Sequence, residues 1–95
     1  MDYRMWKGTV NANENVVPII IQDAVQSDGL RHSDRIYFVG FNGDPGTEFY
    51  LNNSKSPMEI PDSGYFITPY FGERFMPVFS LSFAENFDGK IYYII

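Results

Sequence analysis

The chain has no cysteine and only one histidine, His32, which stands in the polar stretch 29–35. The missing cysteines exclude disulfide bonds, thiolate metal sites and cysteine nucleophiles. His32 is followed directly by Ser33 and Asp34, but the members of a catalytic triad converge in space and rarely come from chain neighbours. We interpret His32 as a solvated loop residue. The sequence therefore predicts a protein that is not an enzyme and that has no catalytic residues, no metal and no other cofactor.

Basic residues are also scarce. Seven lysines and arginines stand against twelve acidic residues, which gives a formal net charge of −5, and no two of the basic residues are adjacent. Proteins bind a phosphate backbone through clustered lysine and arginine, and anionic membrane surfaces attract the same residues. The composition therefore argues against nucleic acid and against a membrane as partners.

Long apolar runs are absent as well. The longest one near the N-terminus, residues 16–21, is interrupted by Pro18, and it is far shorter than the roughly 20 residues that span a bilayer. The first residues lack the hydrophobic region of a signal peptide. We expect the protein to be made in the cytosol and to remain soluble there.

Aromatic residues, by contrast, are abundant, with nine phenylalanines, seven tyrosines and one tryptophan among 95 residues. Such rings pack well on pleated, half-buried surfaces, and the length fits a single domain over residues 1–95. Turn residues recur every 8–12 residues or so. This spacing predicts an all-β fold, a small antiparallel β-sandwich of jelly-roll-like or Ig-like type. We expect about seven or eight short strands and at most one short helix near residues 23–30.

The apolar runs between the turns are the expected strands. They cover residues 3–10, 16–22, 35–41, 47–51, 58–60, 65–70, 78–83 and 90–95. Pro18 would place the second strand at a sheet edge or a bulge. The last strand is apolar on both faces, so we expect it to lie centrally or to be covered by another subunit.

The expected core follows from the alternation of apolar side chains within these strands. It comprises Phe38, Phe49, Leu51, Ile60, Phe66, Phe79, Leu81 and Phe83. Phe79, Leu81 and Phe83 are placed on one face by strict period-two spacing. Gly46 and Gly64 end the turns Asp-Pro-Gly and Asp-Ser-Gly, where we expect a positive φ or a close backbone approach.

The tyrosines and the tryptophan exceed what a small core needs. Tyr and Trp are enriched where an apolar ring meets water, interfaces included. The candidate interface residues are Trp6, Tyr70, Tyr92, Tyr93 and Ile95. The rim of the core and a platform for stacking sugars are the alternatives for these rings.

The segment 35–95 carries several short motifs that recur together in one class of protein. They are Gly46-Thr47-Glu48-Phe49-Tyr50-Leu51-Asn52, Met58-Glu59-Ile60-Pro61 with Ser63-Gly64-Tyr65-Phe66, Val78-Phe79-Ser80-Leu81-Ser82-Phe83, and Ile91-Tyr92-Tyr93-Ile94-Ile95. Together they resemble small β-sandwich modules from the virion proteins of tailed bacteriophages. The motifs consist mostly of turn and core residues, and residues 1–34 match no such module.

This resemblance implies a structural protein of the virion: a capsid decoration, a head-fibre subunit or a tail accessory subunit. Such a protein acts by binding, and its partners would be the major capsid or tail proteins and copies of itself. The expected location is the virion, after synthesis in the host cytoplasm. A carbohydrate-binding module that recognises glycan on the host surface is the alternative function.

Overall fold

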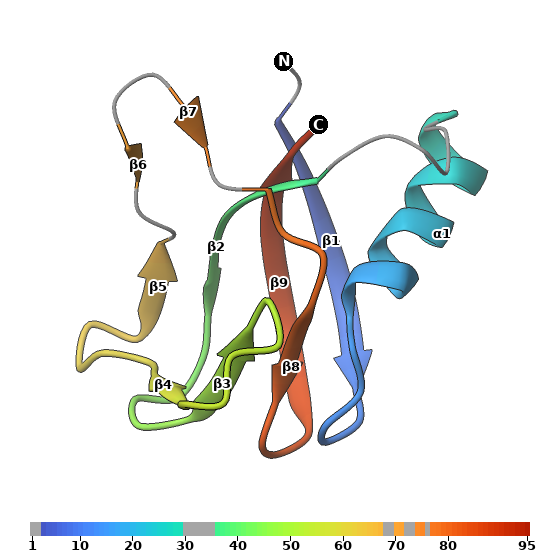
Figure 1. The fold of residues 1–95 in the computed structure, drawn as a ribbon. Helices are drawn as coiled ribbons and strands as arrows, with labels where there is room; N and C mark the ends of the chain where they lie inside the picture. Colours follow the sequence, from blue (N-terminus) through green and yellow to red (C-terminus); the bar gives the residue numbers. More distant parts are fainter. Residues whose placement is uncertain (1–2, 30–35, 68–69, 72–73, 76) are drawn as a thin grey trace.

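The chain folds as a small all-β sandwich with one helix along its side (Figure 1). The computed structural model describes residues 3–29, 36–67, 70–71, 74–75 and 77–95. The larger sheet has the strand order β1-β9-β2-β5 and faces a smaller sheet with the order β4-β3-β8. These two sheets hold seven strands, as the sequence predicts, and strands β6 and β7 add a separate two-stranded hairpin.

The bounds of the elements follow the chain. They are β1 (Tyr3–Val10), α1 (Val17–Asp28), β2 (Tyr37–Asn42), β3 (Glu48–Leu51), β4 (Met58–Glu59), β5 (Tyr65–Ile67), β6 (Tyr70–Phe71), β7 (Arg74–Phe75), β8 (Leu81–Phe83) and β9 (Phe87–Ile94). All strand pairs within the sheets are antiparallel.

Strand β9 lies in the middle of the larger sheet, between β1 and β2. This position accounts for its apolar character on both faces. Ile91, Tyr93 and Ile94 are buried, whereas Tyr92 is exposed. Of the two arrangements expected for a doubly apolar strand, the structure has the central one.

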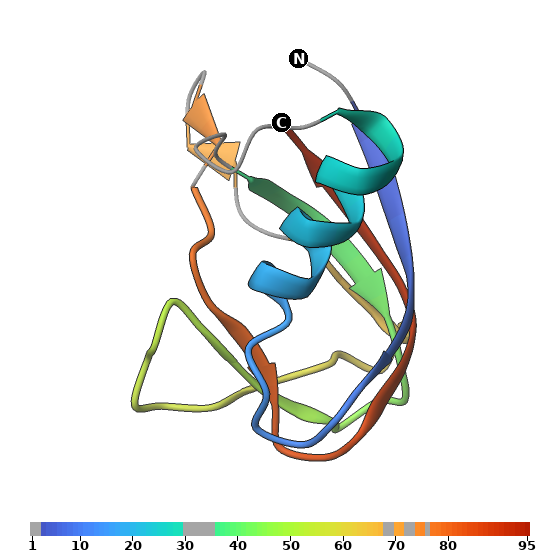
Figure 2. The ribbon, with the colours of Figure 1, turned by 90° about the vertical axis from the view of Figure 1, so that its right-hand side faces the viewer.

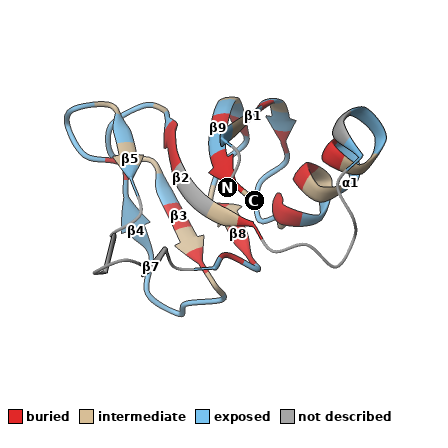
Figure 3. Cartoon of the chain, turned by 90° about the horizontal axis from the view of Figure 1, so that it is seen from above, coloured by how far each residue is buried: buried red, intermediate tan, exposed pale blue. Residues whose placement is uncertain are grey.

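Phenylalanine rings from both sheets form the centre of the core. Phe41 on β2 meets Phe49 on β3 and Phe83 on β8 edge to face, with ring centroids 5.0 and 5.1 Å apart. Phe83 also stacks on Phe87 of β9 at 4.2 Å. Such aromatic pairs contribute about 0.5–1.5 kcal/mol each beyond the area they bury. Figure 3 shows buried residues on the strands of both sheets and on the part of α1 beside them.

Most of the predicted core is confirmed. Phe49, Leu51, Ile60, Leu81 and Phe83 are buried. Phe66 is partly buried against the core. The side chain of Phe38 lies outside the described part of the chain, as does His32.

The prediction for Phe79 is wrong, because its side chain is 61% exposed. The strict alternation does not extend to this residue, since β8 begins only at Leu81. Ser80 and Leu81 are neighbours in sequence and both are buried, so the period-two pattern breaks between them. Before that break, Val78 is the residue that turns inward.

The expected second strand over residues 16–22 is also wrong, because this segment begins helix α1. Pro18 sits in the first helical turn, where its missing N–H costs nothing. The side-chain Oδ1 of Asn15 accepts a hydrogen bond from the Val17 N–H at 3.1 Å. Val17, Ile20 and Ala24 are buried at helical spacing. The helix ends with Gly29 in the left-handed conformation, at φ 75°.

Helix α1 closes the side of the sandwich at which β1 and β8 are the outermost strands (Figure 2). The chain leading into the helix runs along β8 and is bonded to it. Asn13 N–H donates to the Phe83 carbonyl at 2.7 Å, and Val16 N–H donates to the Leu81 carbonyl at 2.8 Å. The edge of β8 is therefore occupied by the protein's own backbone.

The two glycine predictions are confirmed. Gly46 has φ 84° and Gly64 has φ 85°. Both sit in turns closed by backbone hydrogen bonds, from Thr47 N–H to the Asp44 carbonyl and from Gly64 N–H to the Pro61 carbonyl. Residues with a Cβ rarely adopt such backbone angles, which explains why glycine stands at these turns.

Candidate functional site

The outer face of the larger sheet, turned away from the core, carries a concentration of exposed apolar side chains. Among the described residues, five of the seven large hydrophobic side chains that are exposed lie there. They are Tyr3 and Met5 on β1, Tyr92 on β9, and Tyr65 and Ile67 on β5. We call these five residues the outer strip.

Strand register places three residues of the outer strip, Met5, Tyr92 and Ile67, in line across the sheet. Met5 lies opposite Tyr92, Tyr92 lies opposite Gly40, and Gly40 lies opposite Ile67. The side chains of directly opposed residues share one face of a sheet. One rung of the ladder thus carries apolar side chains from three of the four strands, with Gly40 between them.

Gly40 leaves a shallow hollow in this face. Tyr65, Ile67 and Tyr92 line the hollow, whose volume is about 170 Å³. A Cβ at position 40 would lie 2.5 Å from the Phe66 carbonyl oxygen, which is closer than real Cβ contacts come. Glycine is therefore required here by the close approach of β5, and the hollow is a consequence of that packing.

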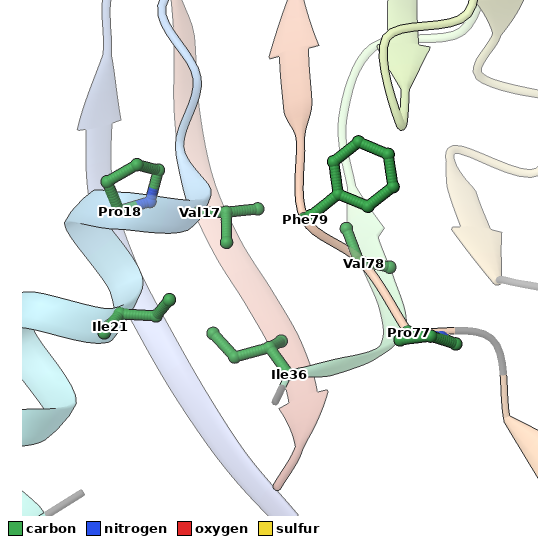
Figure 4. Close-up of a pocket in the computed structure, with 7 residues that line it drawn as sticks. All are labelled: Val17, Pro18, Ile21, Ile36, Pro77, Val78 and Phe79. Atoms are coloured by element: carbon green, nitrogen blue, oxygen red, sulfur yellow. The ribbon is translucent and has the colours of Figure 1, made fainter. Parts of the chain in front are cut away.

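A second apolar feature is a groove between α1 and the segment that precedes β8. Its volume is about 410 Å³, and its lining consists of Val17, Pro18, Ile21, Ile36, Pro77, Val78 and Phe79 (Figure 4). All of these side chains are apolar and none of them is nucleophilic or titratable. The groove can accept an apolar group and offers no chemistry for a reaction.

Two asparagine side chains fix the backbone of Phe79 at the rim of this groove. Asn52 Oδ1 accepts a hydrogen bond from the Phe79 N–H at 3.0 Å, and Asn15 Nδ2 donates to the Phe79 carbonyl at 3.3 Å. Asn15 Oδ1 also accepts from the Leu81 N–H at 3.0 Å. These bonds satisfy the backbone of a segment that does not pair as a strand.

The candidate interface residues differ in their exposure to solvent. Tyr92 is exposed in the outer strip, and Ile95 is partly buried against the core. The side chain of Tyr70 lies outside the described part of the chain. Trp6 and Tyr93 are 6% and 2% exposed, so the expectation that they are exposed anchors is wrong.

Strand alternation explains why Trp6 and Tyr93 point inward. On β1, Trp6 and Val10 are buried, whereas the residues between them are exposed or partly exposed. A Cβ at Gly8 would lie 2.6 Å from the Trp6 ring, so the ring lies over the backbone of Gly8, where no side chain obstructs it. The core is therefore large enough to bury Trp6 and Tyr93, which composition alone suggested were more than a small core needs.

Four residues of the outer strip were missed by sequence reasoning: Tyr3, Met5, Tyr65 and Ile67. A signal for the first two was present, because Lys7 and Thr9 alternate on the same side of β1 as Tyr3 and Met5. A strand face that includes a lysine is typically the outer one. For β5 the strand is only three residues long, which is too short for the pattern to decide between its faces.

Comparison with known proteins gives no relative for this chain: no family model, no curated protein and no solved structure matches it. Within the described ranges, no helix has the length and apolar character needed to cross a membrane. In the same residues, no three histidine or acidic side chains gather in a way that would hold a metal ion.

Proposed function

We propose that the protein is a non-catalytic structural subunit of a bacteriophage virion, which docks on a neighbouring subunit of the capsid or tail lattice through its outer strip. The observation that carries this proposal is the continuous band of exposed apolar side chains on the outer face of the larger sheet. Monomeric soluble proteins rarely leave such a band open to water, and it is typical of a surface that contacts another protein. That the partner belongs to a bacteriophage virion is inferred from the motifs in residues 35–95, which resemble those of virion modules.

The composition of the strip fits a protein contact. Tyrosine and methionine are enriched in interfaces, because they give large contact areas and, for tyrosine, a hydroxyl that can remain hydrated. The strip lies on regular strands with fixed register, so its side chains are held in place before binding. A preorganised surface loses less conformational entropy when the partner docks.

Substitution of Tyr92 by aspartate tests this function. Tyr92 lies within the central rung of the strip, where a carboxylate would be desolvated without a partner on docking. We expect the Tyr92→Asp protein to be incorporated into purified phage particles at least about tenfold less than wild type. Copies per particle are counted by quantitative mass spectrometry.

Phe79→Asp is the matched control for this experiment. Phe79 is exposed, as is Tyr92, but it lies at the rim of the groove beside α1 and outside the larger sheet. We expect this variant to be incorporated like wild type, and we expect both variants to keep the melting temperature of wild type within a few degrees. Equal incorporation of the Tyr92→Asp protein and wild type would refute docking through the strip.

The hollow above Gly40 favours carbohydrate binding as a second candidate function. Two exposed tyrosines, Tyr65 and Tyr92, flank this hollow, and aromatic rings beside a shallow depression can stack against a sugar. A glycan array probed with wild type and with Tyr65→Ala separates the two functions. Glycan binding that Tyr65→Ala removes, together with absence of the protein from virions, would replace the structural function with this one.

A further inference from the structure

The two outer faces of the sandwich differ in the sign of their charge. On the larger sheet, Lys7 of β1 lies directly opposite Lys90 of β9, one rung from Met5 and Tyr92 along the same strands. Asp88 also lies on this face, opposite Thr9, and its carboxylate accepts a hydrogen bond from Thr9 Oγ1 at 3.1 Å. Two ammonium groups therefore border the outer strip.

The outer face of the smaller sheet has the opposite character. Glu48 of β3 lies directly opposite Glu59 of β4, and both are exposed. Phe49, the next residue along β3, is fully buried, so alternation directs Glu48 away from the core. Tyr50 follows in the strand and is half-buried. This face thus offers two adjacent carboxylates.

Each of these pairs places like charges directly across a strand pair, an arrangement that destabilises a sheet. A neighbour that brings the opposite sign relieves both. From this complementarity we propose that the protein assembles head to tail, with the outer strip and Lys7–Lys90 of one copy against the Glu48–Glu59 face of a second copy. The proposal rests on the proposed function, in which the outer strip is a protein-docking surface.

The geometry of the fold decides what kind of assembly results. The two faces belong to opposite sheets and point away from each other (Figure 2). A contact between unlike faces is heterologous, so every bound copy leaves one face of each kind open for the next. Copies that carry a net charge of −5 repel one another at a distance. The head-to-tail orientation reduces this repulsion, because it brings the lysine pair of one copy to the glutamate pair of the next. The expected product is a ring or a filament of identical subunits.

Charge reversal of each face, alone and in combination, tests the assembly. Lys7→Glu/Lys90→Glu makes both outer faces acidic, and Glu48→Lys/Glu59→Lys makes both basic. We expect wild type to form concentration-dependent oligomers in sedimentation velocity, and each double variant to associate about a hundredfold or more weakly, because like charges then meet. An equimolar mixture of the two variants should regain oligomers, since each variant again faces a partner of opposite sign.

Recovery in the mixture is the decisive readout, because a mere loss of stability in either variant would not be repaired by mixing. Glu14→Lys/Asp23→Lys is the control, since it carries the same net charge as Glu48→Lys/Glu59→Lys but changes residues at and before α1. It should associate like wild type. A wild type that remains monomeric, or a mixture that remains monomeric, would overturn the head-to-tail assembly. The proposed function is tested separately, because incorporation of the Tyr92→Asp protein is measured in particles and does not require that free copies associate in solution.

Discussion

Replacement of Phe83 by alanine is expected to lower the free energy of unfolding by about 3–5 kcal/mol. The Phe83 side chain has no exposed area, stacks on Phe87 and meets Phe41 edge to face. Its removal therefore leaves a cavity at the point where the two sheets touch. This loss is a large part of the stability of a domain of this size. Urea unfolding followed by fluorescence of Trp6, the single and buried tryptophan, measures it.

Phe79→Ala is the matched control, because it removes the same ring from a residue four positions earlier. Since Phe79 is mostly exposed at the rim of the groove, we expect its removal to change the free energy of unfolding by less than about 1 kcal/mol. Similar losses for the two variants would contradict the inward and outward assignments on either side of the break at Ser80.

The second large effect is expected at Asn52, whose side chain bonds the segment 77–80. Its Oδ1 accepts from the backbone N–H groups of Phe79 and Ser80, and its Nδ2 donates to the Pro77 carbonyl. Asn52→Ala removes all three bonds, each worth about 0.5–1.5 kcal/mol. We expect a loss of about 2 kcal/mol in the free energy of unfolding, measured in the same urea titration.

Asn53→Ala separates these hydrogen bonds from the backbone conformation. Asn52 and Asn53 have nearly the same positive φ, 53° and 58°, so alanine introduces a similar backbone strain at both positions. Asn53 is exposed, so we expect the smaller loss there. If Asn53→Ala destabilises the protein as much as Asn52→Ala does, backbone strain and not the side-chain bonds would explain the effect.

The fold class was predictable from the sequence because turn residues and aromatic runs alternate at sandwich spacing. The two apolar faces of the last strand predicted either a central position or cover by another subunit, and the structure has the central position. Helix α1 was not predicted over its first half, because Val, Ile and Pro in residues 16–22 have local preferences that favour an edge strand. Burial of Val17, Ile20 and Ala24 along one face outweighs those preferences, since tertiary packing supplies most of the stability of a helix.

The candidate site was predictable only in part. Tyr92 was identified because the last strand is apolar on both faces. If one of these faces is not packed against the core, its apolar side chains are exposed. Trp6 and Tyr93 were misassigned because the number of aromatic residues is known from composition, whereas the volume available in the core is not. Gly8 supplies space for the Trp6 ring, and that contact depends on strand geometry. The opposed pairs Lys7–Lys90 and Glu48–Glu59 depend on strand register, which the sequence alone does not reveal.

The most direct test of the outer strip is photo-crosslinking inside assembled particles. A benzophenone amino acid replaces Ile67, an exposed residue of the strip, in one preparation, and in another it replaces Phe79, an exposed residue at the rim of the groove beside α1. Purified virions are irradiated, and the crosslinked proteins are identified by mass spectrometry. We expect crosslinks from position 67 to another virion protein or to a second copy of this chain, at a yield well above that from position 79. Absence of the protein from virions, or equal yields from the two positions, would contradict docking through the outer strip.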